Sequence, residues 1–221
     1  MKGIKKSTLE EFGYKEYGKL DLVNNKKDAI YVNVLSLVVL VAMVALIPLF
    51  VKGTIEEFIL YFNPLHSIVL LIMIILYIPL HELVHGVFMK SFSGEKLSFG
   101  WKLVYAYCGS KEGMVNYPEY STVALAPLVV FSIVFIAMMV LMPSWALVWY
   151  LMEVVNVSGS AGDIYVTLKL WKDRKKDILV NDTGTEMTIY KRVYERGGEI
   201  LLPFNLFQVC FPDPSNRIRQ P

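Results

Sequence analysis

An uncharged apolar run from Ile30 to Val51 limits the folds open to this chain more than any other feature. A helix needs about 20 apolar residues to cross ~30 Å of hydrocarbon, and this run is long enough. Three further apolar segments cover about residues 63–89, 121–142 and 145–168. With only 19% charged residues in the whole chain, these runs exclude an ordinary soluble domain and predict a membrane protein.

The basic residues between these runs predict an orientation. Lys and Arg concentrate in residues 1–28, 90–120 and 169–221, whereas residues 52–62 carry one and residues 143–144 none. By the positive-inside rule the basic segments lie in the cytoplasm, so we expect a multi-pass protein of the cell membrane with both termini cytoplasmic. The net charge of +2 gives no reason to expect a nucleic-acid partner.

The fold class predicted from these runs is an all-α membrane protein, a four-transmembrane-helix bundle with short cytoplasmic β elements. The chain divides into a cytoplasmic N-terminal segment (1–29), a membrane core with the four spans (30–168) and a cytoplasmic C-terminal tail (169–221). Gly and Ser among β-branched and aromatic residues predict short strands in the 95–120 loop, and two β-rich runs around Asp182 to Gly184 predict a hairpin in the tail.

Two histidines and a glutamate lie inside the second apolar run, where ionisable residues are costly and mark a functional site. His81, Glu82 and His85 form the pattern H-E-x-x-H. Residues four apart share a helix face, so both imidazoles can bind one ion while Glu82 can approach a water on it. The alternative is a histidine pair that is hydrogen-bonded within a helix bundle without a metal.

A hydrolytic zinc centre usually has three protein ligands. His66 lies 15 residues before His81, about 22 Å along a helix, so it cannot reach the same ion. His81 and Asp163 each lie 18 residues inside their spans, about 27 Å from the outer surface, whereas Glu153 is about 15 Å shallower. We therefore predict Asp163 as the third ligand; the alternative is a capping or salt-bridging aspartate near the helix end.

Other residues near Asp163 suggest supporting roles. Asn156 precedes it by two helical turns and so faces the same way; it could bind substrate, or simply hydrogen-bond another helix. The small residues 158–162 permit close helix packing or local unwinding. Pro79 should kink the second span. Cys108 and Cys210 fall on the predicted cytoplasmic side, where we expect no disulfide.

The segment "HELVHG", followed two spans later by "NVSGSAGD", resembles the putative zincin peptidases. This family consists of small multi-pass bacterial membrane proteins and is similar in plan to the site-2-protease-type intramembrane zinc metalloproteases. The resemblance implies a bacterial cytoplasmic membrane and a zinc ion (Zn2+) held by His81, His85 and an acidic residue from a later span, which is Asp163 here. Site-2 proteases typically have an L-D-G sequence at the third ligand, whereas this chain has Gly162, Asp163 and Ile164.

These features predict a zinc-dependent, membrane-embedded peptidase. It would hydrolyse membrane or membrane-proximal protein or peptide substrates near the cytoplasmic side of the lipid bilayer, with a zinc-activated water and Glu82 as general base. A strand edge within residues 95–120 could pair with the substrate. The alternative is a non-catalytic membrane interaction or signalling protein with a structural metal site, which would need four protein ligands. A zinc transporter is less favoured, because no inverted repeat is detectable.

Overall fold

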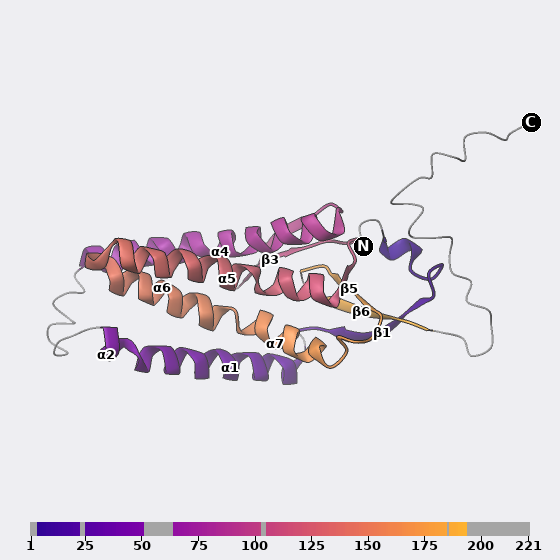
Figure 1. Cartoon of the computed structure of the whole chain (residues 1–221), viewed down its shortest axis with the longest axis horizontal. Coiled ribbons are helices and arrows are strands. Elements are labelled where there is room, and N and C mark those ends of the chain that lie inside the picture. Colours follow the sequence, from indigo (N-terminus) through magenta and orange to yellow (C-terminus); the bar gives the residue numbers. More distant parts are fainter. Residues whose placement is uncertain (1–3, 23–24, 51–63, 103–104, 185, 194–221) are drawn as a thin grey trace, which may run out of the picture.

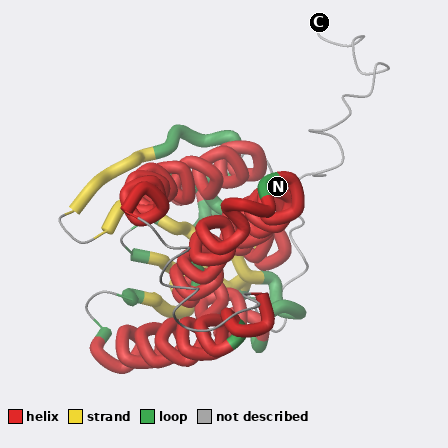
Figure 2. Tube along the Cα trace, turned by 90° about the vertical axis from the view of Figure 1, so that its left-hand side faces the viewer, coloured by secondary structure: helices red, strands yellow, loops and turns green. Residues whose placement is uncertain are grey.

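The computed structural model is mostly helical and elongated, and its helices lie side by side along the long axis (Figure 1). It describes residues 4–22, 25–50, 64–102, 105–184 and 186–193. The helices are α1 (Lys26–Ala45), α2 (Ile47–Phe50), α4 (Pro64–Ser93), α5 (Tyr117–Leu141), α6 (Ala146–Gly159) and α7 (Ala161–Trp171), with short 3-10 helices at Lys6–Thr8 and Pro143–Trp145. In a view turned by 90°, the helices gather in one bundle (Figure 2).

Three of the described helices, α1, α4 and α5, are long and apolar enough to cross a membrane. Their outward side chains are apolar and exposed; examples are Ile30 at 61%, Ile72 at 51% and Val140 at 74%. Exposed apolar surface of this extent on helices of this length is consistent with contact with a bilayer. The first three predicted spans are thus present as apolar helices, although residues 51 and 63 at their edges lie outside the described part of the chain.

The fourth predicted span, residues 145–168, is not one helix. It consists of α6 and α7, which follow one another in the same general direction with a break at Ser160 (Figure 1). The break lies within the small residues 158–162, where local unwinding was one of two expectations. Each piece alone is too short to span ~30 Å of hydrocarbon. A crossing by α6 and α7 together remains a prediction.

A four-stranded antiparallel sheet lies at the end of the bundle opposite α2 (Figure 1). Its strand order is β1 (Tyr14–Leu20), β6 (Met187–Arg192), β5 (Ile178–Asp182) and β4 (Val115–Asn116). The predicted tail hairpin is present as β5 and β6, joined through Gly184, whose φ of +83° suits a residue without a Cβ.

Strand β1 was not expected, so the prediction of an all-α chain with only short local β elements was too simple. The β1–β6 register shifts between Glu16 and Gly18, which marks a bulge. A bulge adds one residue to a strand and breaks the two-residue alternation by which strands are recognised. The N-terminal segment and the C-terminal tail, predicted as separate units, therefore meet in one sheet.

A second, two-stranded sheet comes from the 95–120 loop, as predicted. Strands β2 (Ser98–Lys102) and β3 (Tyr105–Gly109) pair antiparallel and pack against α4. The close approach is possible because Gly86 follows His85: a Cβ at position 86 would lie 2.7 Å from Cζ of Phe99 and 3.0 Å from Sγ of Cys108. The hairpin therefore lies directly beside the H-E-x-x-H turn of the helix.

Helix α5 starts at a capping box that joins it to β4. The Asn116 side chain accepts the Glu119 N–H at 2.9 Å, and the Glu119 carboxylate accepts the Asn116 N–H at 2.9 Å. Buried Val115, Val123, Val166 and Val180 belong to one apolar cluster that packs the sheet against α5 and α7. The sheet is therefore held at the end of the bundle where His85 and Asp163 lie.

Candidate metal centre and its cavity

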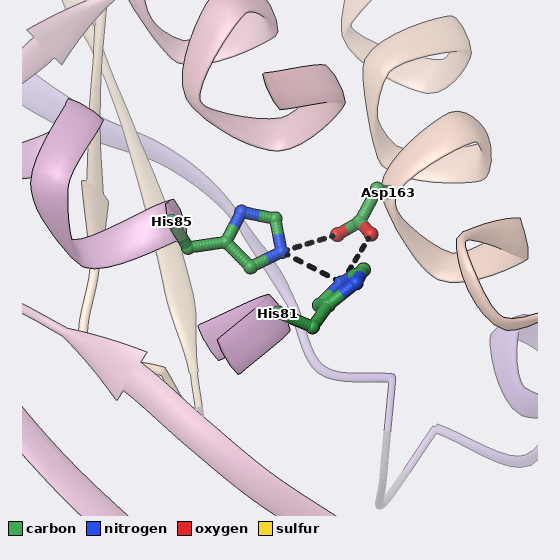
Figure 3. A group of neighbouring side chains, drawn as sticks. All are labelled: His81, His85 and Asp163. Atoms are coloured by element: carbon green, nitrogen blue, oxygen red, sulfur yellow. Dashed lines mark hydrogen bonds and ion pairs between the residues drawn. The ribbon is translucent and has the colours of Figure 1, made fainter. Parts of the chain in front are cut away.

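His81, His85 and Asp163 converge at the sheet end of the bundle (Figure 3). Nε2 of His81 lies 3.2 Å from Nε2 of His85 and 3.5 Å from Oδ2 of Asp163, and Nε2 of His85 lies 3.5 Å from Oδ1 of Asp163. The side chains are 12%, 13% and 25% exposed, respectively. Two turns of α4 and the start of α7 thus supply three ligand atoms to one point.

These separations fit a tetrahedral metal ion. Zinc bonds of about 2.0–2.1 Å at tetrahedral angles place any two ligand atoms about 3.3–3.4 Å apart, and the three separations are 3.2, 3.5 and 3.5 Å. Two imidazoles and a carboxylate are also a donor set that zinc accepts. Among the His, Cys, Asp and Glu of the described residues, this group holds three ligands, so a fourth position can remain open.

The hydrogen bond made by His85 shows which of its nitrogens is available to bind a cation. Its Nδ1 lies 2.9 Å from the backbone oxygen of Val123 in α5. Because a carbonyl oxygen can only accept, Nδ1 carries the hydrogen and neutral His85 presents an Nε2 lone pair. This lone pair faces a carboxylate oxygen of Asp163 at 3.5 Å. A positive charge between these two electron-rich groups would stabilise the contact, and a metal ion or a proton on the imidazole can supply it.

Around His81, side chains form the outer contacts. Its Nδ1 lies 2.8 Å from the hydroxyl of Tyr77, which donates to Oδ1 of Asn156 at 2.9 Å. Asn156 is completely buried in α6 and bonds groups of α4 and α5. This is the helix–helix hydrogen bonding that was one of its two expected roles; a contact with substrate remains a prediction. Tyr77 was missed, although its position one turn before His81 could have suggested it.

Asp163 lies in the first turn of α7, where the helix dipole favours a negative charge. A buried ionic contact ties this short helix to α1: Asp28, 5% exposed, accepts hydrogen bonds from the Tyr165 hydroxyl at 2.6 Å and from Nζ of Lys169 at 2.8 Å. Asp28 therefore serves as an anchor for α7, while Asn25 caps α1. The anchor sets the position of α7, and with it that of Asp163.

A cavity of about 250 Å³ adjoins two of the three ligands. Glu82, His85 and Asp163 line it from the helices, and Cys108 and Asp182 line it from strands β3 and β5. The Glu82 carboxylate lies near the backbone of Cys108 in β3. The general-base candidate thus faces the same space as two of the ligands, and the open side of the centre adjoins a cavity large enough for several water molecules.

Two groups at the strand side of this cavity have altered acidity. Burial raises the pKa of the Cys108 thiol to about 12, and the nearby Glu82 carboxylate adds to the effect. Cys108 therefore stays a thiol at neutral pH, whereas a metal ligand would be a thiolate. Burial also raises the pKa of Asp182, although the Gly184 N–H opposes this. Nothing in the sequence pattern of the tail indicated that Asp182 lies near the histidines.

Within the described part of the chain, the other residues considered from the sequence supply no ligand atom to the group of His81, His85 and Asp163. The His66 ring packs on Trp145, 4.4 Å between centroids, near the start of α4. Glu153 is buried beside Asn156 and accepts a hydrogen bond from Ser132. Cys108 is a free thiol; Cys210 lies outside the described residues, so the expected absence of a disulfide stays a prediction.

Comparison with known proteins agrees with this site. Residues 73–178 match the model of a family described as putative zincin peptidase, which agrees with the resemblance predicted from the sequence. The match contains all three converging ligands and Glu82. No curated protein and no solved structure matches the chain.

Proposed function

We propose that the protein is a zinc-dependent, membrane-embedded peptidase. The observation that carries the proposal is the convergence of His81, His85 and Asp163 at tetrahedral spacing beside a cavity that Glu82 also lines. The family match supports a metallopeptidase. A zinc ion at this centre would polarise the scissile carbonyl and lower the pKa of a water toward ~7.

The chain's own residues then have separate tasks. Glu82 takes the proton of the attacking water and passes it to the leaving amine, which is the work of a general base followed by a general acid. Glu82 and Cys108 line the same cavity, so the β2–β3 hairpin lies beside the general base. His81, His85 and Asp163 hold the metal, and their burial keeps bulk water away from three of its four positions.

Membrane or membrane-proximal protein segments are the proposed substrates. Lipid-facing helices surround the site on one side, and the four-stranded sheet, three of whose strands come from the two basic terminal segments, lies on the other. The positive-inside rule places that sheet, and thus the cavity, toward the cytoplasm of a bacterial cell membrane. The β2–β3 hairpin lies beside the catalytic turn of α4, so its edge is in place to hold an extended substrate by strand pairing.

The decisive experiment is Glu82→Gln in zinc-loaded protein reconstituted in nanodiscs. We expect zinc content to be unchanged and cleavage of an unfolded probe, β-casein, to fall by at least about 10²-fold, because general acid–base catalysis contributes 10²–10⁴-fold. Mass spectrometry of the products measures the cleavage. The matched control is Glu112→Gln, which removes a carboxylate that contacts the Ser7 N–H outside the cavity. Retained cleavage by Glu82→Gln would exclude Glu82 as the base.

A further inference from the structure

The orientation of the Asn156 side-chain amide is set by its neighbours. Nδ2 lies 3.1 Å from the backbone oxygen of Leu128 in α5, a group that can only accept a hydrogen bond. The amide nitrogen must therefore be on this side, and Oδ1 on the other. Oδ1 lies 2.9 Å from the hydroxyl of Tyr77. Because an amide oxygen carries no hydrogen, Tyr77 is the donor in this bond.

This assignment decides the state of His81. A tyrosine hydroxyl has one hydrogen, and that of Tyr77 is used by Asn156. Toward Nδ1 of His81, 2.8 Å away, the same oxygen can only accept. Neutral His81 must then carry its hydrogen on Nδ1 and present a lone pair at Nε2, the atom that faces Asp163 at 3.5 Å.

The buried carboxylate of Glu153 follows Asn156 in this series of hydrogen bonds. Glu153 is 8% exposed; one of its oxygens accepts from the Ser132 hydroxyl at 2.6 Å, and the other lies 3.2 Å from Nδ2 of Asn156. No rotation of the amide would satisfy both Leu128 and Glu153, since that would turn an oxygen toward two acceptors. Groups from α4, α5 and α6 thus enforce one arrangement.

We propose that Tyr77 and Asn156 are positioning residues that hold His81 as the tautomer with a free Nε2, and that Glu153 fixes the Asn156 amide. The inference rests on the proposed zinc site and assigns Asn156 to ligand orientation instead of substrate contact. His85 reaches the same state through a single backbone carbonyl. The tautomer of His81 depends on the side chains of Tyr77 and Asn156. A mutation of either residue can therefore change that tautomer while His81 itself is kept.

Zinc affinity, measured by chelator competition in nanodiscs, provides the first test. Tyr77→Phe leaves Nδ1–H of His81 without an acceptor, and Asn156→Leu frees the Tyr77 hydroxyl to donate to Nδ1, which favours the wrong tautomer. Loss of such outer contacts weakens metal binding by about 10–100-fold. Tyr150→Phe is the matched control, because it removes the hydroxyl of another tyrosine of low exposure, one that bonds the Met43 oxygen and not a histidine; its affinity should equal that of the wild type.

Two further readouts separate this role from a general loss of packing. The double variant Tyr77→Phe/Asn156→Leu should bind zinc no more weakly than Tyr77→Phe alone, because Asn156 acts on His81 only through the hydroxyl. In metal-free protein that carries Asp163→Ala, which removes the carboxylate facing Nε2, and at a pH where imidazole is neutral, nitrogen NMR should show hydrogen on Nδ1 of His81 while Asn156 is present and on Nε2 after Asn156→Leu. A His66→Gln background reduces the spectrum to His81 and His85.

The outcomes distinguish the two proposals. If the wild type binds no zinc, the proposed function fails. If the wild type binds zinc and Tyr77→Phe binds it equally well, or if His81 keeps its hydrogen on Nδ1 in Asn156→Leu, the positioning role is wrong while the metal site stands. Additive losses in the double variant would also contradict it.

Discussion

Helix α4 and the broken pair α6–α7 supply the side chains of the same candidate metal centre in different ways. Helix α4 is continuous over Pro64–Ser93, and the four-residue spacing of its two histidines alone places both on one face. The other ligand, Asp163, stands three residues after the break at Ser160, on an 11-residue helix that Asp28 ties to α1. Two ligands are therefore set by local helix geometry and the third by tertiary packing.

The difference teaches how robust each part of the centre is. A long helix keeps its internal spacing whatever packs around it, because its backbone hydrogen bonds are internal. A short helix is marginal on its own and takes its position from its neighbours. Disturbing contacts far from the metal should therefore affect the Asp163 side of the centre, whereas the histidine side should respond only to changes on α4 itself or on the groups that bond its imidazoles.

Removal of one ligand from each helix should have the largest effect. We expect His81→Ala and Asp163→Ala each to lose stoichiometric zinc, measured by metal analysis of purified protein, because two remaining ligands leave a weak site. Asp173→Asn, a carboxylate just beyond α7 that pairs with Lys176, is the control and should keep its zinc. If Asp163→Ala retained one zinc per chain, the third ligand would lie elsewhere and α7 would not contribute to the centre.

The next largest effect should come from adding a methyl group to α4, which should lower the stability of the protein. The same addition to α6 should not. Gly86→Ala would bring a Cβ to 2.7 Å from Phe99, and overpacking of this kind costs about 1–3 kcal/mol. Gly159→Ala in α6 meets no atom within 4 Å and should be neutral or slightly stabilising. Denaturation midpoints in detergent measure both.

The same pair of variants has a chemical readout. A displaced β2–β3 hairpin would expose Cys108, whose pKa of about 12 keeps it protonated in the intact site. In a Cys210→Ser background, iodoacetamide at pH 8 should therefore modify Cys108 faster in Gly86→Ala than in Gly159→Ala. Equal rates would show that the hairpin does not depend on the close approach at Gly86.

Loosening the anchor of α7 should give the smallest effect. Asp28→Asn removes the charge that Tyr165 and Lys169 contact, and we expect a loss of about 1–2 kcal/mol in stability, less than for a fully buried pair because Lys169 can reach water. Zinc affinity should fall a few-fold. Lys176→Met, which breaks the more exposed Lys176–Asp173 pair, is the control, since solvent-exposed pairs contribute little to stability. Unchanged zinc affinity in Asp28→Asn would mean that α7 is positioned by apolar packing alone.

Much of the site was accessible from the sequence because its signals are local. The spacing of His81 and His85 is a property of one helix, and the equal depth of His81 and Asp163 follows from counting residues along two apolar runs. The tail hairpin was predicted because its strands are adjacent in the chain and share a glycine turn. Each of these inferences needs only the period of one element or the length of one run.

Only the tertiary structure decided which distant segments meet. It paired β1 with β6, placed Asp182 of the tail in the cavity beside His85, and connected His81 through Tyr77 to a buried amide in another helix. These contacts join residues as far apart in the chain as Tyr14 and Arg192, and no periodicity within an element encodes such a pairing. Side-chain packing and hydrogen-bond satisfaction select it among many alternatives, because only one arrangement buries all these polar groups with partners.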